Sequence, residues 1–261
     1  GGFGGVNALA VLPNGDLIAG GFFTNAGGVN ANNIARWNGT AWSAFGTGIS
    51  GGVSALAVLP NGDLVAGGGF NSIGGVSGNR IARWNGTAWS PLGTGENDRV
   101  RALAVLPNGD MVAGGDFTFA GGVSANRIAR WNGTAWSAFG TAMSSGVVNA
   151  LAVLPNGDLI AGGRFRTAGG VIANNIARWN GSSWSALGSG MSSADSSFAQ
   201  TGEVKALAVL PNGDLIAGGF VTTAGGVTVS RIARWNGTAW SALGAGVDNL
   251  VNALAVLPNG D

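Results

Sequence analysis

An aspartate and an arginine recur together along this sequence, and these residue types can perform acid–base chemistry or form an ion pair. The pairs are Asp16 and Arg36, Asp63 and Arg83, Asp110 and Arg130, Asp158 and Arg178, and Asp214 and Arg234. Catalysis uses one positioned acid or base, whereas these repeated pairs would give five equivalent sites. We therefore expect structural ion pairs between neighbouring strands, within or between sheets.

A second set of polar, charged and aromatic residues differs from copy to copy of the same repeat, which makes it the better candidate for binding. In one group of connections the residues are Asn71, Asp116, Phe119, Arg164 and Arg166. In a second group they are Glu96, Asp98, Arg99, Asp195, Phe198, Gln200 and Asp248. Loops held by a rigid scaffold usually carry binding residues, so we expect a protein or glycan partner to bind here.

Residues 192–203 form the longest connection, and they contain three of these candidates, Asp195, Phe198 and Gln200. A single enlarged loop over an otherwise regular repeat is either a ligand clamp or a tolerated surface insertion. In the strands that follow two of the connections, Arg101 and Lys205 replace Asn or Ser. Two added positive charges would make that region locally basic.

Several functional classes are excluded by composition. The chain has no histidine, cysteine or tyrosine, and its acidic residues follow no calcium-loop spacing, so we expect no metal site and no cofactor. The formal net charge is +1 and the basic residues form no stripe, which argues against nucleic-acid binding. No apolar run reaches the roughly 18 residues of a membrane helix, so we expect no membrane span.

The elements that position these residues come from one repeated sequence. Its Leu-Pro-Asn-Gly-Asp core begins at Leu12, Leu59, Leu106, Leu154, Leu210 and Leu257, with spacings of 47, 47, 48, 56 and 47 residues. A fixed period of this size indicates a repeat architecture, in which every copy forms the same small unit. We therefore expect one domain over residues 1–261.

The first copy shows how each unit is built. Residues 6–12 form an apolar strand a, and Asn14-Gly15 favours a tight hairpin turn into strand b at residues 17–23. Residues 24–33 are expected as a loop, with strand c at 34–37 and strand d at 42–45. Four short antiparallel strands per period, with no helical periodicity, are typical of a β-propeller blade.

Two tryptophans flank the c–d turn of every copy. In the first copy they are Trp37 and Trp42, which should lie opposite each other on one face of the hairpin. Exposed rings could stack on sugars, but every copy has the same pair at the same spacing. We therefore expect the tryptophans to pack between neighbouring blades.

Strand order separates the connections into two sides. The a–b and c–d turns emerge on one side and are nearly identical in every copy. The b–c and d–a connections emerge on the other side and carry almost all of the differences between copies. The candidate binding residues therefore share one side of each blade.

The stretch Leu-Pro-Asn-Gly-Asp-Leu-Ile-Ala-Gly-Gly-x-Phe, continued by Gly-Gly-Val and Ile-Ala-Arg-Trp-Asn-Gly, carries a family resemblance. It is similar to the kelch-like and delta-60-type β-propeller repeats of secreted bacterial proteins. The resemblance covers the whole chain and implies an all-β propeller. It does not imply one activity, because such repeats serve adhesion, scaffolding and catalysis alike.

The repeat predicts five complete four-stranded blades and a surplus strand. The blades span residues 6–50, 53–97, 100–146, 148–203 and 204–247, and the extra strand spans residues 251–261. An unpaired apolar edge favours strand addition, so one expectation is self-association through Val251–Asp261. The strand could equally replace the first one or continue into a longer array.

These observations favour a non-enzymatic extracellular or cell-surface scaffold that binds a protein or glycan through its variable b–c and d–a connections. Abundant Gly, Ser, Thr and Asn with few charges favour that location. The alternative is a structural subunit of an array or filament joined through the terminal strand. A third hypothesis is a hydrolase or lyase that uses Asp116, Arg164, Asp195 or Glu203.

Overall fold

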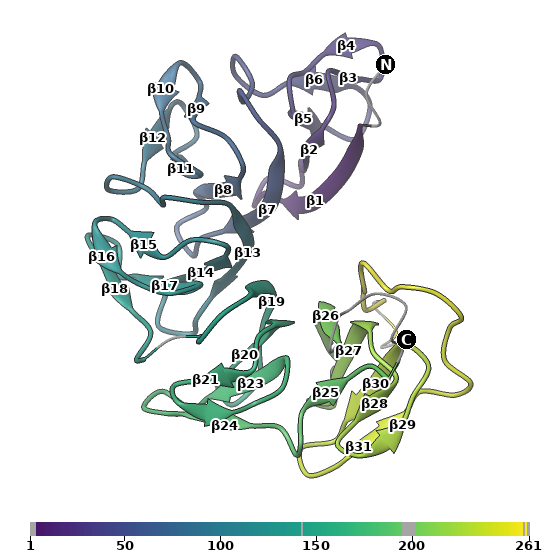
Figure 1. Ribbon diagram of the computed structural model, residues 1–261. Helices are drawn as coiled ribbons and strands as arrows, with labels where there is room; N and C mark the ends of the chain where they lie inside the picture. The colour runs from purple at the N-terminus through teal and green to yellow at the C-terminus, as the bar shows by residue number, and fades with distance from the viewer. Residues whose placement is uncertain (1–3, 142, 195–201, 258, 260–261) are drawn as a thin grey trace. The chain divides into compact units, whose positions relative to one another are not determined.

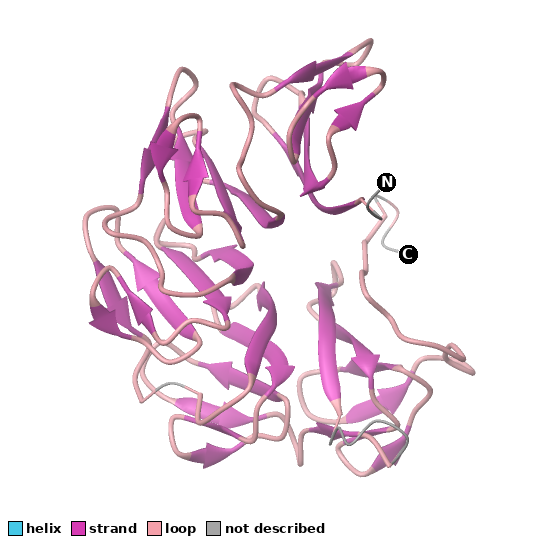
Figure 2. Ribbon diagram, turned by 45° about the horizontal axis from the view of Figure 1, so that its top comes forward, coloured by secondary structure: helices cyan, strands magenta, loops and turns pink. Residues whose placement is uncertain are grey.

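A computed structural model describes residues 4–141, 143–194, 202–257 and 259, and these residues form strands and turns without a helix (Figures 1 and 2). Five four-stranded antiparallel sheets follow one another along the chain, each with its strands in sequence order. The predicted all-β propeller fold is confirmed, with one sheet to each blade. In the described part of the chain, no helix is long and apolar enough to cross a membrane.

The observed strands fall close to the predicted ranges. The first sheet contains β1 (Gly5–Val11), β2 (Leu17–Phe22), β5 (Ile34–Trp37) and β6 (Trp42–Ala44). The second contains β7 (Val53–Val58), β8 (Leu64–Gly68), β11 (Ile81–Trp84) and β12 (Trp89–Pro91). The third contains β13 (Val100–Val105), β14 (Met111–Gly115), β17 (Ile128–Trp131) and β18 (Trp136–Ala138).

The last two sheets follow the same pattern. The fourth contains β19 (Val147–Val153), β20 (Leu159–Arg164), β23 (Ile176–Trp179) and β24 (Trp184–Ala186). The fifth contains β26 (Glu203–Val209), β27 (Leu215–Phe220), β30 (Ile232–Trp235) and β31 (Trp240–Ala242). The chain divides into two compact units, residues 1–125 with 129–138 and residues 126–128 with 139–261. The single domain over residues 1–261 stays a prediction.

The b–c connections differ from the predicted loops, because each contains two short strands around a Gly-Gly turn. These strands are β3 (Asn25–Ala26) and β4 (Val29–Asn30), β9 (Ser72–Ile73) and β10 (Val76–Ser77), β15 (Phe119–Ala120) and β16 (Val123–Ser124), β21 (Thr167–Ala168) and β22 (Val171–Ile172), and β28 (Thr223–Ala224) and β29 (Val227–Thr228). A further strand, β25 (Met191–Ser192), lies in the d–a connection between β24 and β26 and pairs with β28 of the last b–c connection. Both turn glycines have positive φ, for example 55° at Gly27 and 85° at Gly28, which glycine adopts readily.

Adjacent Gly-Gly pairs in the b strands serve two packing needs at once. A side chain on Gly20 would place its Cβ 2.5 Å from Cγ1 of Val53, so this glycine lets the next sheet approach closely. A Cβ on Gly21 would lie 2.1 Å from the Gly5 carbonyl oxygen, beside a bulge between Val6 and Ala8. The first glycine therefore accommodates a neighbouring sheet and the second accommodates a bulge within its own sheet.

Hydrophobic cores lie between successive sheets of each unit. One core joins Ile18 and Ile34 of the first sheet to Leu64 of the second. A second core joins the second sheet to the third, and a third joins the fourth to the fifth. Each blade therefore buries its apolar surface against a neighbouring copy, as repeat proteins do.

The predicted tryptophan pair is present in every sheet, and its packing between blades is present in four of them. Trp37 pairs directly with Trp42, and the ring centroids of the five equivalent pairs are 5.3–5.5 Å apart. The second ring is buried in four sheets, at Trp89, Trp136, Trp184 and Trp240. Indole nitrogens also bond to the preceding sheet: Trp136 Nε1 donates to the Leu92 carbonyl at 3.0 Å. These tryptophans therefore connect neighbouring blades.

The surplus terminal segment differs from the prediction. Residues 251–257 form no strand, while residues 258, 260 and 261 lie outside the described residues. Val251 nevertheless packs against β27, where a Cβ on Gly218 would lie 2.5 Å from its Cγ1. Val53 approaches Gly20 in the same way, so the segment packs as a first strand without pairing as one. Self-association through it stays a prediction.

Candidate binding site

The b–c connection of the fourth sheet begins with two exposed arginines around a buried phenylalanine. Arg164 ends β20, and Arg166 follows Phe165, whose exposed fraction is only 3%. Successive residues of an extended chain point to opposite faces. Burial of Phe165 therefore places both arginine side chains on the outer side of the blade.

A residue with left-handed backbone geometry precedes strand c in every sheet. Its φ is 64° at Asn33 and 73° at Asn175, a region that asparagine tolerates better than most residues. Asn175 Oδ1 accepts a hydrogen bond from the Phe165 amide at 3.1 Å, and its Nδ2 donates to the Met191 carbonyl at 2.8 Å. The side chain thereby joins the start of the b–c connection to the next d–a connection.

The other three sheets have an arginine at this left-handed position. These residues are Arg80, Arg127 and Arg231, with φ values of 69°, 71° and 65°. Two of them lie across the start of their own connection: Arg80 donates to Asn71 Oδ1, and the Arg231 guanidinium lies 4.5 Å from the Phe220 ring centroid. A long side chain thus covers this surface where the fourth sheet has a short asparagine.

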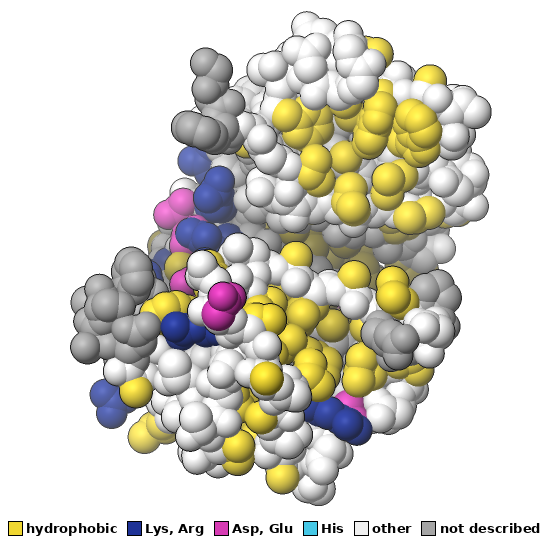
Figure 3. Space-filling model, turned by 90° about the vertical axis from the view of Figure 1, so that its right-hand side faces the viewer, with side chains coloured by type: hydrophobic (Ala, Val, Ile, Leu, Met, Phe, Trp, Pro, Cys, Tyr) yellow, Lys and Arg dark blue, Asp and Glu magenta, His cyan; other side chains and the backbone are white. Residues whose placement is uncertain are grey.

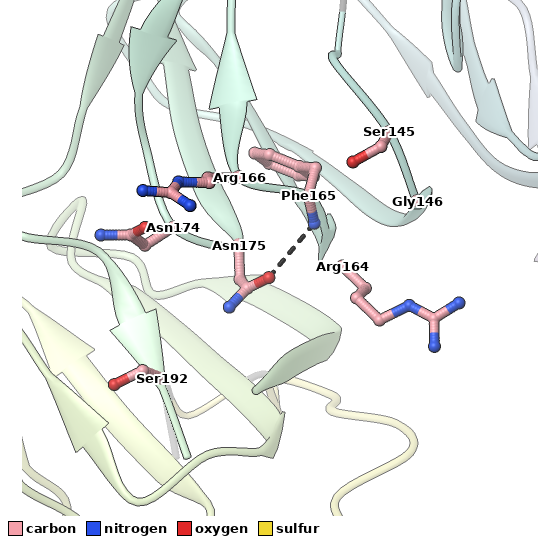
Figure 4. A pocket seen from close by; sticks show the side chains of 8 residues that line it. All are labelled: Ser145, Gly146, Arg164, Phe165, Arg166, Asn174, Asn175 and Ser192. Atoms are coloured by element: carbon pink, nitrogen blue, oxygen red, sulfur yellow. Dashed lines mark hydrogen bonds between the residues drawn. The ribbon is translucent and has the colours of Figure 1, made fainter. Parts of the chain in front are cut away.

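The fourth sheet has a cavity of about 560 Å³ at this position (Figure 4). Its lining comprises Ser145, Gly146, Arg164, Phe165, Arg166, Asn174, Asn175 and Ser192. Figure 4 shows the Arg164 and Arg166 guanidinium groups on opposite sides of Asn175. The lining combines the b–c connection with residues of the d–a connections before β19 and after β24. Both groups of connections therefore meet at one side of the blade, as the strand order predicts.

A comparable cavity lies at the other asparagine-bearing sheet but carries no charge. It has a volume of about 300 Å³ and is lined by Asn32, Asn33, Thr47, Gly48, Ile49, Ser50, Ser72, Gly74 and Gly75. Asn33 makes the same two bonds as Asn175, to the Phe23 amide and the Ile49 carbonyl. The two cavities share a backbone design, and the arginines distinguish the fourth sheet.

Two protein families described as β-propellers match this chain. The family described as the Rax2 C-terminal beta propeller domain matches residues 80–259, which is more than half of the chain. The chain belongs to this family. A second family, described as the domain of unknown function (DUF5122) beta-propeller, matches residues 12–39 and 59–86 of the propeller. Among curated proteins there is no match.

Solved structures share the fold of this propeller at low sequence identity. A catalytically inactive virginiamycin B lyase from Staphylococcus aureus, with quinupristin, is 14% identical with a TM-score of 0.62, covering 96% of this chain and 73% of the lyase. A GH74 enzyme from Niastella koreensis is 20% identical with a TM-score of 0.57, covering 92% of this chain and 37% of the enzyme. Likeness at such identity shows the fold alone.

Several residues predicted for binding or for the hydrolase or lyase hypothesis have partners inside the chain. Asp116 Oδ2 lies 2.7 Å from Arg101 Nε, and Glu203 Oε2 lies 3.3 Å from Lys205 Nζ. The two positive charges expected to make this region basic are therefore each opposed by a carboxylate. Asn71 accepts the bond from Arg80 described above.

None of the other described candidates lines the cavity. Phe119 is 48% exposed in β15, and Asp98, Arg99 and Asp248 are exposed in d–a connections. Asp195, Phe198 and Gln200 lie outside the described residues. Exposed hydrophobic side chains also occur on the first sheet, at Val6, Leu9 and Val11, and Figure 3 shows hydrophobic side chains gathered on the face it presents.

Glu96 lies in the core between sheets instead of on the expected loop surface. Its exposed fraction is 4%, and it occupies the position of the buried Ile49, Met143 and Met191 in other copies. Its amide donates to the Asn79 carbonyl at 3.0 Å, and this bond fixes the backbone of residue 96 beside the preceding b–c connection. Neither carboxylate oxygen has a hydrogen-bond partner among the described residues. Burial therefore raises the pKa of the Glu96 carboxyl well above its ordinary value.

The predicted ion pairs are present within single sheets. Arg36 Nη2 lies 2.6 Å from Asp16 Oδ2 and Arg83 Nε lies 2.5 Å from Asp63 Oδ2, while the corresponding pairs at Arg130, Arg178 and Arg234 bond through Nε. In the first turn Asn14 Nδ2 also donates to the Asp16 carboxylate at 2.6 Å. These groups orient the a–b turn, on the side opposite the variable connections, and leave the cavity residues as the candidates for binding.

Proposed function

We propose that this propeller is a non-enzymatic extracellular or cell-surface scaffold that binds a glycan through its b–c and d–a connections. The supporting observation is the cavity of about 560 Å³ where both groups of connections meet in the fourth sheet. Its volume falls within the roughly 300–1,000 Å³ of small-molecule sites. Its serine and asparagine side chains match the hydroxyl groups of sugars in hydrogen-bonding chemistry.

Hydrogen bonds and packing hold the cavity walls in place, which favours a fixed site over an adaptable loop. Asn175 connects the Phe165 amide to the Met191 carbonyl, and Phe165 is buried in the blade. The cavity walls are thus held by hydrogen bonds and packing before a ligand arrives. Such preorganisation lowers the entropy lost on binding.

The test is a glycan array followed by titration calorimetry of bound glycans with the variant Asn175→Arg. This change introduces the residue type that Arg80, Arg127 and Arg231 show at the same backbone geometry, so the fold should tolerate it. We expect the longer side chain to occupy the cavity and to weaken binding tenfold or more.

Asn33→Arg is the matched control, because it makes the same change at the equivalent position of the first sheet. It should leave affinity within about twofold, since the two positions lie in different sheets. An array without any bound glycan would contradict the proposal. Equal losses in both variants, or none in Asn175→Arg, would place binding elsewhere on the chain.

A further inference from the structure

The two arginines at the fourth-sheet cavity differ from most other basic residues in that they face no described carboxylate. Basic side chains at seven positions form ion pairs with carboxylates: Arg36, Arg83, Arg101, Arg130, Arg178, Lys205 and Arg234. Among the described residues, Arg164 and Arg166 form none. Their positive charge is therefore not balanced by a described carboxylate.

Among the residues that the structure describes, the cavity lining contains no acidic side chain. Its other polar side chains are serines and asparagines, which are neutral and can donate hydrogen bonds. An arginine guanidinium presents several N–H donors in a planar arrangement suited to the oxygens of carboxylates and related anions. Two such groups at one cavity favour an anionic ligand over a neutral one.

The equivalent positions in the other sheets lack this pair. At the Arg164 position they have Phe22, Gly69, Asp116 and Phe220. At the Arg166 position they have Thr24, Asn71, Thr118 and Thr222. The paired arginines therefore serve no need of the repeat itself, because four other blades form without them.

The open space comes from a second difference at the same sheet. Asn175 stands where three other sheets have arginine, and its amide is committed to Phe165 and Met191. In the fourth sheet the positive charges are therefore at the start of the b–c connection and not at the left-handed position, and their guanidinium groups lie on opposite sides of Asn175 (Figure 4). The fourth sheet therefore lacks the covering arginine and has two arginines, Arg164 and Arg166, that the other sheets lack.

We infer that this cavity is an anion-binding site, and that its ligand is an acidic glycan with carboxylate or sulfate groups held by Arg164 and Arg166. The glycan part of this inference rests on the proposed function. The anionic part rests on the two guanidinium groups, which form no ion pair with a described carboxylate, and on the absence of acidic residues from the described lining. Asn174, Ser145 and Ser192 would contact the hydroxyl groups of the sugar.

The test measures binding of three disaccharides by calorimetry: one sulfated, one with a uronic acid, and one neutral with the same linkage. We expect both acidic disaccharides to bind at least tenfold more tightly than the neutral one, and more weakly as salt rises. The double variant Arg164→Gln and Arg166→Gln should lose that preference.

Two further variants separate a built site from general charge attraction. Arg80→Gln with Arg99→Gln removes the same charge from the first unit and should keep full binding. Asn175→Arg adds positive charge but fills the cavity, so it should weaken binding of the acidic disaccharides, whereas general attraction would strengthen it. Equal losses in the two double variants would overturn the inference.

Failure of the inference can be told from failure of the proposed function. If the neutral disaccharide binds as tightly as the acidic ones, and Asn175→Arg abolishes that binding, the cavity binds glycans but is not an anion site. If inorganic sulfate binds alone and neither acidic disaccharide does, the cavity is an anion site but not a glycan site. Absence of all binding overturns both proposals.

Discussion

At the scale of single residues, two positions differ from their counterparts in ways with measurable consequences. Asn175 replaces arginine and opens a cavity, while Glu96 replaces an apolar residue in a core. The first change creates a surface feature that a ligand can use. The second places a carboxyl where Ile49 or Met143 stand in other copies, and its consequence should be a pH-dependent stability.

Glu96→Gln should raise the free energy of unfolding at neutral pH. Burial raises the pKa of the Glu96 carboxyl above its unfolded value, so the folded chain keeps the proton to higher pH than the unfolded chain does. The stability contributed by the protonated carboxyl is full below about pH 4 and is lost as pH rises through the raised pKa. Urea unfolding at pH 4, 6 and 8 measures this loss.

Wild type and variant should therefore agree near pH 4, and at pH 8 wild type should be the less stable by about 1.4 kcal/mol for every unit by which the pKa of the folded chain exceeds that of the unfolded chain. Asp98→Asn is the control, because it removes an exposed carboxylate two residues away and should change stability by less than about 0.5 kcal/mol. Parallel pH curves for wild type and Glu96→Gln would show that the carboxyl is not buried in the folded chain.

At the scale of elements, the tryptophan of strand d connects one sheet to the preceding one. Trp136 Nε1 donates to the Leu92 carbonyl, whereas Trp89 Nε1 has no partner among the described residues. Both rings are buried in the first unit to nearly the same degree, 5% and 6% exposed. The pair therefore isolates the hydrogen bond from the packing of the ring.

Trp136→Phe should cost more stability than Trp89→Phe by about 0.5–1.5 kcal/mol, the usual net contribution of one hydrogen bond. Both substitutions remove a similar ring volume, so their common loss reports the cavity left behind. Urea unfolding midpoints of the two variants give the difference. Equal midpoints would mean that the indole bond adds nothing to the contact between the sheets.

At the scale of the whole molecule, the repeat predicts the blades because each strand is defined locally. Asn14-Gly15 sets the hairpin turn, and the Asp16 and Arg36 pair follows from strand register. The same signals recur in every copy, so a strand wrongly assigned in one copy would disagree with the strands assigned in the others. The fold, the ion pairs and the tryptophan pairs could all be predicted for this reason.

The site could be predicted only in part, because it depends on contacts between distant segments. Arg164 and Arg166 stand out in the sequence as differences between copies, but Asn175 and Ser192 do not. Aligning the five b–c connections does show asparagine at position 175 where three copies have arginine, but the first copy has asparagine too, so the difference alone does not mark a site. Burial of Glu96 was not predictable from its place in a connection, since the Asn79 carbonyl that binds its amide belongs to another connection.

Backbone hydrogen exchange of this propeller, with and without saturating sulfated disaccharide, tests the central claim most directly. The claim is that one blade among five has become the binding site through changes in its b–c connection. With the disaccharide bound, we expect exchange to slow at residues 144–146, 164–167, 174–175 and 192. Exchange at the equivalent residues 22–25 and 32–33 of the first sheet should not change. Slowing spread over all five sheets, or absent from the fourth, would contradict the claim.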